Sequence, residues 1–155
     1  MPSETCILGL GSPNGDDQAG WRIVERLQRH TDTAVAIFAS ADPLRLIELD
    51  QDYWGVIVVD ACSTGGAAGT ITRLQWPDSR IRSRHGHSSH SFSVAEALHL
   101  ADQMGRLPEH VVLFGIETGT CRPDAAMSAA VVRALPALEQ QVLQEVVRSE
   151  GVALG

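Results

Sequence analysis

The chain has 155 residues, of which 44% are hydrophobic and 20% charged, a composition typical of one soluble globular domain. Its net charge of −7 argues against a nucleic-acid-binding surface, which needs clustered positive charge. All 12 residues counted as Lys+Arg are arginine, which excludes the lysine of a P-loop and the amine of Schiff-base chemistry.

The same features predict a cytoplasmic protein with a single domain over residues 1–155. No apolar stretch reaches the roughly 18 residues that would span a bilayer. The first residues lack the basic and apolar regions of a secretory signal. Three widely spaced cysteines, Cys6, Cys62 and Cys121, fit no metal or disulfide spacing, and we expect them in the core in reduced form.

Apolar runs alternate with amphipathic stretches along the whole chain. The pattern predicts a strand at 5–11, a helix at 17–30, a strand at 33–38, a short helix at 43–49 and strands at 56–60 and 70–74. It then predicts a helix at 93–104, a strand at 110–116 and a helix at 128–147. Asp42 is placed to cap the short helix, with Pro43 at its first position, and Pro136 should kink or split the last helix. This order predicts a three-layer α/β/α sandwich around a mostly parallel twisted sheet.

A glycine-rich loop, GLGSPNGDD, joins the first strand to the first helix. The spacing of Gly9, Gly11 and Gly15 is one residue too long for a dinucleotide-binding motif, and Asp16 and Asp17 would face the pyrophosphate. Considered alone, either aspartate could simply cap the helix.

A second carboxylate, Asp60, ends the apolar strand at 56–60. Ligands of parallel sheets bind beyond the carboxyl ends of the strands, so we expect Asp60 to lie near the glycine-rich loop. Carboxylates that converge there repel one another unless a cation lies between them. A phospho-accepting receiver domain also has such acids, but it uses a lysine that this chain lacks.

The segment 84–90 contains three histidines, His85, His87 and His90. A solvated polar loop is one explanation of this run. The other is a mixed site of carboxylates and imidazole, which suits nickel, zinc, manganese or iron better than magnesium or calcium.

Taken together, these segments resemble the hydrogenase maturation endopeptidases, cytoplasmic proteins that trim the C-terminus of the large subunit of [NiFe] hydrogenases. Residues 9–20 are similar to the family's G-x-G-N and D-[DE]-x-x-G motif, and residues 56–61 to its V-[IV]-x-[DA]-D-A segment. Residues 88–90 are similar to its S-x-H, and residues 115–118 to its G-[IV]-x-P. Ser12 stands in place of the usual asparagine, and the expected proline near Glu117 is absent.

The resemblance implies an aspartic-type endopeptidase whose site residues, both catalytic and metal-contacting, are Asp17, Asp60 and His90. It implies that nickel arrives in the hydrogenase large-subunit precursor, so that the protein itself holds no permanent cofactor. The precursor is then the partner, and neither nucleic acid nor a membrane is involved. Two alternatives stay open: a metal-dependent hydrolase that keeps its own zinc or manganese and cleaves a small substrate, and a non-catalytic module that binds the precursor.

Overall fold

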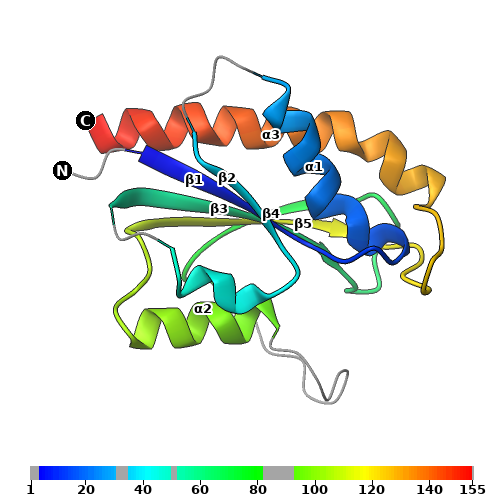
Figure 1. Cartoon of the computed structure of the whole chain (residues 1–155), viewed down its shortest axis with the longest axis horizontal. Coiled ribbons are helices and arrows are strands. Elements are labelled where there is room, and N and C mark those ends of the chain that lie inside the picture. Colours follow the sequence, from blue (N-terminus) through cyan, green and yellow to red (C-terminus); the bar gives the residue numbers. More distant parts are fainter. Residues whose placement is uncertain (1–3, 31–34, 50–51, 82–92, 155) are drawn as a thin grey trace.

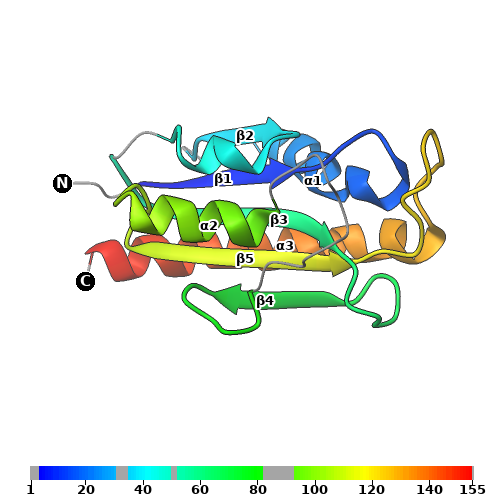
Figure 2. The same cartoon turned by 90° about the horizontal axis from the view of Figure 1, so that it is seen from below.

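Five strands form one sheet in the order β2-β1-β3-β5-β4, in a computed structural model that describes residues 4–30, 35–49, 52–81 and 93–154. The strands are β1 (Glu4–Leu10), β2 (Ile37–Ser40), β3 (Tyr53–Cys62), β4 (Ile71–Gln75) and β5 (His110–Glu117). The pairs β1–β2, β1–β3 and β3–β5 are parallel, whereas β4 runs antiparallel to β5 at one edge (Figure 2). The mostly parallel sheet is therefore confirmed.

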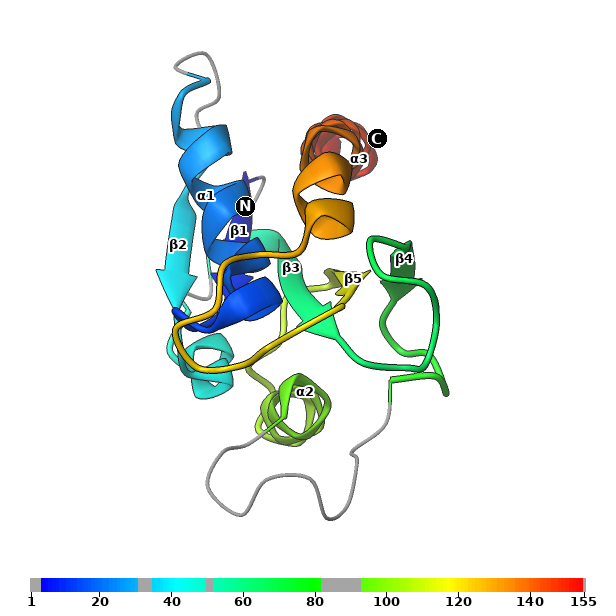
Figure 3. The same ribbon diagram turned by 90° about the vertical axis from the view of Figure 1, so that its right-hand side faces the viewer.

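Helices cover both faces of this sheet, which confirms the three-layer sandwich (Figures 1 and 3). The helices α1 (Ala19–Gln28) and α3 (Ala129–Leu154) lie on one face, and α2 (Val94–Gln103) lies on the other, together with the short 3-10 helix η2 (Pro43–Leu46). Successive strand residues point to opposite faces, so the strands contribute side chains to a hydrophobic core on each face of the sheet. Ile57 and Phe114 pack in the core under α1 and α3, whereas Val56 and Val58 pack in the core against α2.

The local predictions hold with shifted boundaries. Asp42 caps η2 by accepting the N–H of Leu44 (2.9 Å), and Ser93 caps α2 by accepting the N–H of Glu96 (3.1 Å). The strand predicted at 33–38 is observed at Ile37–Ser40, and the strand predicted at 56–60 extends over Tyr53–Cys62. The sheet decides these ends, because pairing continues wherever a neighbouring strand offers partners.

The last helix differs from its prediction, because α3 runs through Pro136 without a split and continues to Leu154. Proline removes the bond to the carbonyl four residues earlier, that of Val132. Val132 and Pro136 are both exposed, so water can satisfy that carbonyl. Meanwhile the buried stripe through Val142 and Val146 keeps the helix packed on the sheet.

The carboxyl ends of β1, β3 and β5 meet at the same end of the sheet. Three connections leave from there: the loop 11–18, which contains the 3-10 helix η1 (Gly15–Gln18), the loop 63–70 and the loop 118–128. These loops define the candidate site. None of the helices in the described part of the chain is long and apolar enough to cross a membrane.

Candidate active site

The glycines of the opening motif let α1 pack closely on the sheet. A Cβ added at Gly20 would lie 2.1 Å from the carbonyl oxygen of Leu10 and 2.8 Å from that of Val59. A Cβ added at Gly11 would lie 2.5 Å from the carbonyl oxygen of Asp17. The motif therefore brings the start of α1 against the ends of β1 and β3, and no phosphate is needed to explain it.

Asp16 is fully buried and ties the opening loop to the loop 118–128. Its carboxylate accepts backbone N–H bonds from Gly119 (2.6 Å), Thr120 (2.9 Å) and Ser128 (2.6 Å), and the hydroxyl of Ser128 lies at 2.8 Å. Burial raises the pKa of Asp16, but these bonds outweigh burial and the net shift is downward. Asp16 is thus a charged anchor whose carboxylate is engaged by four hydrogen bonds.

Asp17 and Asp60 are brought together, as the position of the two strand ends predicts. Both residues are only partly exposed. The pKa of Asp60 is raised from 3.8 to about 8, first by burial of its carboxyl group and second by the negative charge of Asp17. The backbone N–H of Ala61 acts in the opposite direction but does not offset these effects.

Among the residues that the structure describes, no basic side chain is among the groups that shift the pKa of Asp60. Within the described ranges, no three His, Cys, Asp or Glu residues form a group that could hold a metal ion. A cation supplied from outside would remove the repulsion that raises the pKa of Asp60. The third predicted site residue, His90, lies outside the described residues, as do His85 and His87.

Two further residues at this end of the sheet were not predicted as site residues from the sequence. Glu117, only 3% exposed, ends β5 opposite Cys62 and accepts hydrogen bonds from the loop 63–70. A carboxylate that closes an apolar strand was the signal that identified Asp60, and the same signal is present at Glu117. Cys121 is exposed, so the prediction of three core cysteines is wrong for this residue, although Cys6 is buried and Cys62 partly buried.

Cys121 lies beside the aspartates, where only the fold could place it. Although much of the residue is exposed, burial of its thiol and the charges of Asp17 and Asp16 raise its pKa, whereas a hydrogen bond with Thr118 lowers it. A thiol with a raised pKa is a poor nucleophile at neutral pH.

The fold is shared with solved structures of hydrogenase maturation proteases. The structure is similar to the hydrogenase maturating endopeptidase HybD from E. coli, with a TM-score of 0.77 and 23% identity over 94% of this chain and 93% of that one. It is also similar to the [NiFe] hydrogenase maturation protease HycI from Thermococcus kodakarensis, with a TM-score of 0.70 and 21% identity over 92% and 91% of the two chains.

The sequence itself gives the family. Residues 21–145 match the family described as hydrogenase maturation protease, and the chain belongs to this family. The hydrogenase expression/formation protein HupD from Thiocapsa roseopersicina is 29% identical over 124 residues, which cover 76% of this chain. The match covers 56% of HupD, so the chain spans little more than half the length of that relative.

Proposed function

We propose that this protein is an endopeptidase that removes the C-terminal extension of a [NiFe] hydrogenase large-subunit precursor after nickel has been inserted. Membership of the maturation protease family supports the reaction class. The observation that carries the proposal is the position of the Asp60 carboxyl group near Asp17, where burial first and the charge of Asp17 second raise the pKa of Asp60 to about 8. Two acids that repel each other in this way form a site that a cation would stabilise.

In this proposal the nickel belongs to the substrate. A nickel ion already held in the precursor has open positions, to which Asp17, Asp60 and His90 add two carboxylates and an imidazole. The donor set fits a transition metal, since two oxygen donors are supplied by the described residues and the histidine adds nitrogen. Loaded precursor is preferred because it offers coordination bonds that empty precursor lacks.

Cleavage of the peptide bond requires an activated water, and the site offers two means of activation. A carboxylate of the pair can accept a proton from water, and the nickel can polarise the scissile carbonyl. The reaction as a whole adds one water across one peptide bond and releases the C-terminal peptide. In this proposal the step takes place in the cytoplasm.

The direct test incubates purified precursor with the protein and follows the precursor by intact-mass measurement. The wild-type protein should shorten nickel-loaded precursor at one bond. Asp17→Ala, Asp60→Ala and His90→Ala should each abolish shortening while leaving the far-ultraviolet circular dichroism unchanged. Asp102→Ala, which removes an exposed carboxylate from α2, is the matched control and should process normally.

Normal shortening by any of the three site variants would remove that residue from the site. Binding of the precursor without any change in its mass would instead identify a non-catalytic module.

A further inference from the structure

Glu117 organises the loop that follows Asp60. The carboxylate of Glu117 accepts the N–H of Thr64 at 2.8 and 3.0 Å, the hydroxyl of Thr64 at 2.7 Å and the N–H of Gly66 at 2.6 Å. The thiol of Cys62 donates to the same carboxylate at 3.3 Å. All of these donors lie within residues 62–66, which are the last residue of β3 and the turn that follows it.

The backbone around Glu117 holds the rest of the same loop. The carbonyl of Glu117 accepts the N–H of Gly69 (2.8 Å), and its own N–H donates to Thr70 (2.9 Å). Next to it, the N–H of Thr118 donates to the carbonyl of Cys62 (3.0 Å). A proline at Thr118, as the motif has it, could not make this last bond. The loop 63–70 is therefore held both by the side chain of Glu117 and by the main chain of Glu117 and Thr118.

Stability alone does not require such an arrangement. The residues 63–67 are exposed, so their N–H groups could bond to water, yet those of Thr64 and Gly66 donate to a carboxylate of a residue that is only 3% exposed. Burial raises the pKa of Glu117, but the bonds from Thr64, Gly66 and Cys62 outweigh burial and lower it, so the group stays ionised at neutral pH. A buried charge is kept because every oxygen is bonded.

The hydrogen bonds of Glu117 also affect Asp60, which precedes Cys62 by two residues on the same strand. In the register of the sheet Asp60 lies opposite Gly115, and Cys62 lies opposite Glu117. Fixing Cys62 and Thr64 fixes the end of β3, and with it the direction of the Asp60 carboxyl group. Glu117 also engages the Cys62 thiol, which lies on the same strand end as Asp60.

We infer that Glu117 is a positioning residue for the reaction, which holds Asp60 and the loop 62–66 in the geometry that precursor cleavage needs. The inference rests on the proposed function, and Glu117 contacts neither the nickel nor the peptide. A small displacement of a catalytic group can cost about 100-fold in rate, so the effect should fall on kcat.

The test compares Glu117→Ala with Glu117→Gln. Alanine removes the side-chain acceptors of the loop and keeps the main-chain bonds of residue 117. Glutamine keeps a carbonyl oxygen at Oε1, where three of the bonds end, and loses an acceptor only at Oε2, which serves Cys62 and one of the contacts with Thr64. We expect kcat to fall about 100-fold in Glu117→Ala with KM changed less than about 3-fold, and glutamine to restore most of the loss.

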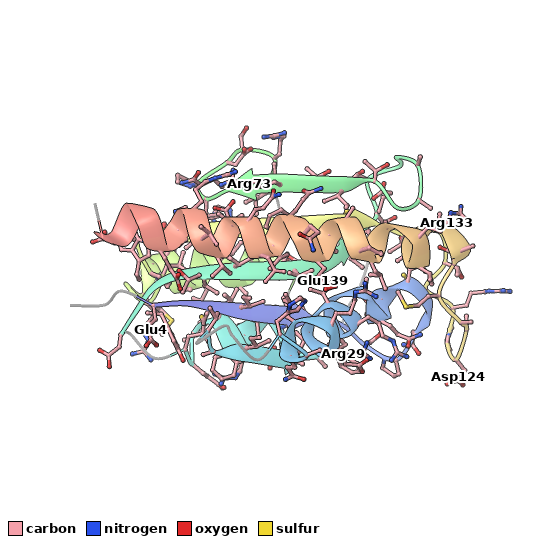
Figure 4. The ribbon with its side chains drawn as sticks, turned by 90° about the horizontal axis from the view of Figure 1, so that it is seen from above. Glu4, Arg29, Arg73, Asp124, Arg133 and Glu139 are labelled. Atoms are coloured by element: carbon pink, nitrogen blue, oxygen red, sulfur yellow. The ribbon has the colours of Figure 1, made fainter. Side chains whose placement is uncertain are left out.

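Glu145→Gln provides the matched control for loss of a buried carboxylate. Glu145 is 1% exposed and bonds to Arg73 and His110 near the amino end of β5, far from the site. Figure 4 shows Arg73 well away from Asp124, which marks the tip of the loop 118–128 at the site end. This variant should lower Tm but leave kcat unchanged at temperatures where it is folded.

Hydrogen exchange gives a second readout that does not depend on activity. The amides of Thr64 and Gly66 should exchange at least about 10-fold faster in Glu117→Ala than in the wild-type protein, and at the wild-type rate in Glu145→Gln. Unchanged exchange at these amides, or a kcat loss no larger than that of Glu145→Gln, would overturn the assignment. Failure of the wild-type protein itself to shorten the precursor would overturn the proposed function, and the exchange data would still decide whether Glu117 holds the loop.

Discussion

Asp16 and Asp17 are neighbours in the chain, yet their carboxylates differ in burial and in the groups they contact. Asp16 is buried and bonded by donors of the loop 118–128, whereas Asp17 is partly exposed and close enough to Asp60 to raise its pKa. The 3-10 turn η1 separates the two directions, since adjacent side chains in such a turn point about a third of a turn apart. Asp16 therefore anchors the loop 118–128, whereas Asp17 lies near Asp60.

Replacement of Asp16 by asparagine should destabilise the protein by about 3 kcal/mol, because three N–H groups surround the carboxylate and an amide NH2 would oppose one of them. Asp17→Asn should change stability by less than about 1 kcal/mol. Urea denaturation of the two variants measures both values. Equal losses would contradict the division of roles between Asp16 and Asp17.

Asp60 should make the protein less stable as pH rises. The folded protein keeps a proton on Asp60 up to a pKa of about 8, whereas the unfolded chain releases it near 3.8, so the folded state binds more protons over this window and stability falls from pH 4 to pH 8. Asp60→Asn cannot ionise. Its stability relative to the wild-type protein should therefore be at least about 1 kcal/mol greater at pH 8.5 than at pH 5.

Denaturant titrations in the presence of a chelator measure this difference. Asp102→Asn, an exposed carboxylate on α2, is the control and should change stability little at either pH. An advantage of Asp60→Asn that is the same at both pH values would show that Asp60 ionises normally in the folded protein.

At the scale of elements, glycine residues allow α1 to pack closely against the sheet. Gly9 and Gly20 face one another, and a Cβ at Gly9 would lie 2.4 Å from the carbonyl oxygen of Gly20. This close approach sets the distance between α1 and the ends of β1 and β3. The position of Asp17, three residues before Gly20, depends on it.

Gly20→Ala should therefore cost about 3 kcal/mol, because the methyl group would overlap the carbonyl oxygens of Leu10 and Val59 and α1 would have to move. The control is Gly151→Ala. Gly151 lies in the exposed last part of α3 with no atom within 4 Å of its added Cβ, so alanine should stabilise the helix by about 0.5 kcal/mol. Thermal or urea unfolding compares the two, and a tolerated Gly20→Ala would refute the packing role of the motif.

The elements also show how far the sequence could predict the structure. Hydrophobic runs located every strand and α-helix of the described chain, and the capping signal of Asp42 was direct, because these depend on local chemistry. Strand ends, the continuity of α3 at Pro136 and the antiparallel β4 depend on partners that are distant in sequence. Local patterns do not contain that information.

At the scale of the whole molecule, the site is a product of topology. Asp17, Asp60 and Glu117 come from three segments, and the parallel register of β1, β3 and β5 brings them to one end of the sheet. The rule for parallel sheets predicted the pairing of Asp17 with Asp60. It could not reveal that Asp16 and Glu117 anchor the loops, since those roles rest on hydrogen bonds to backbone groups of other loops.

The measurement that tests the account most directly is precursor cleavage under four conditions. Nickel-loaded or nickel-free precursor is incubated with protease that is either stripped of metal or supplemented with it. If the carboxylate pair contacts nickel held by the precursor, loaded precursor should be cut in both protease states. A preference of about 4 kcal/mol would give roughly a thousandfold advantage over empty precursor. Efficient cutting of empty precursor by supplemented protease would contradict the account and identify a metal-dependent hydrolase that carries its own ion.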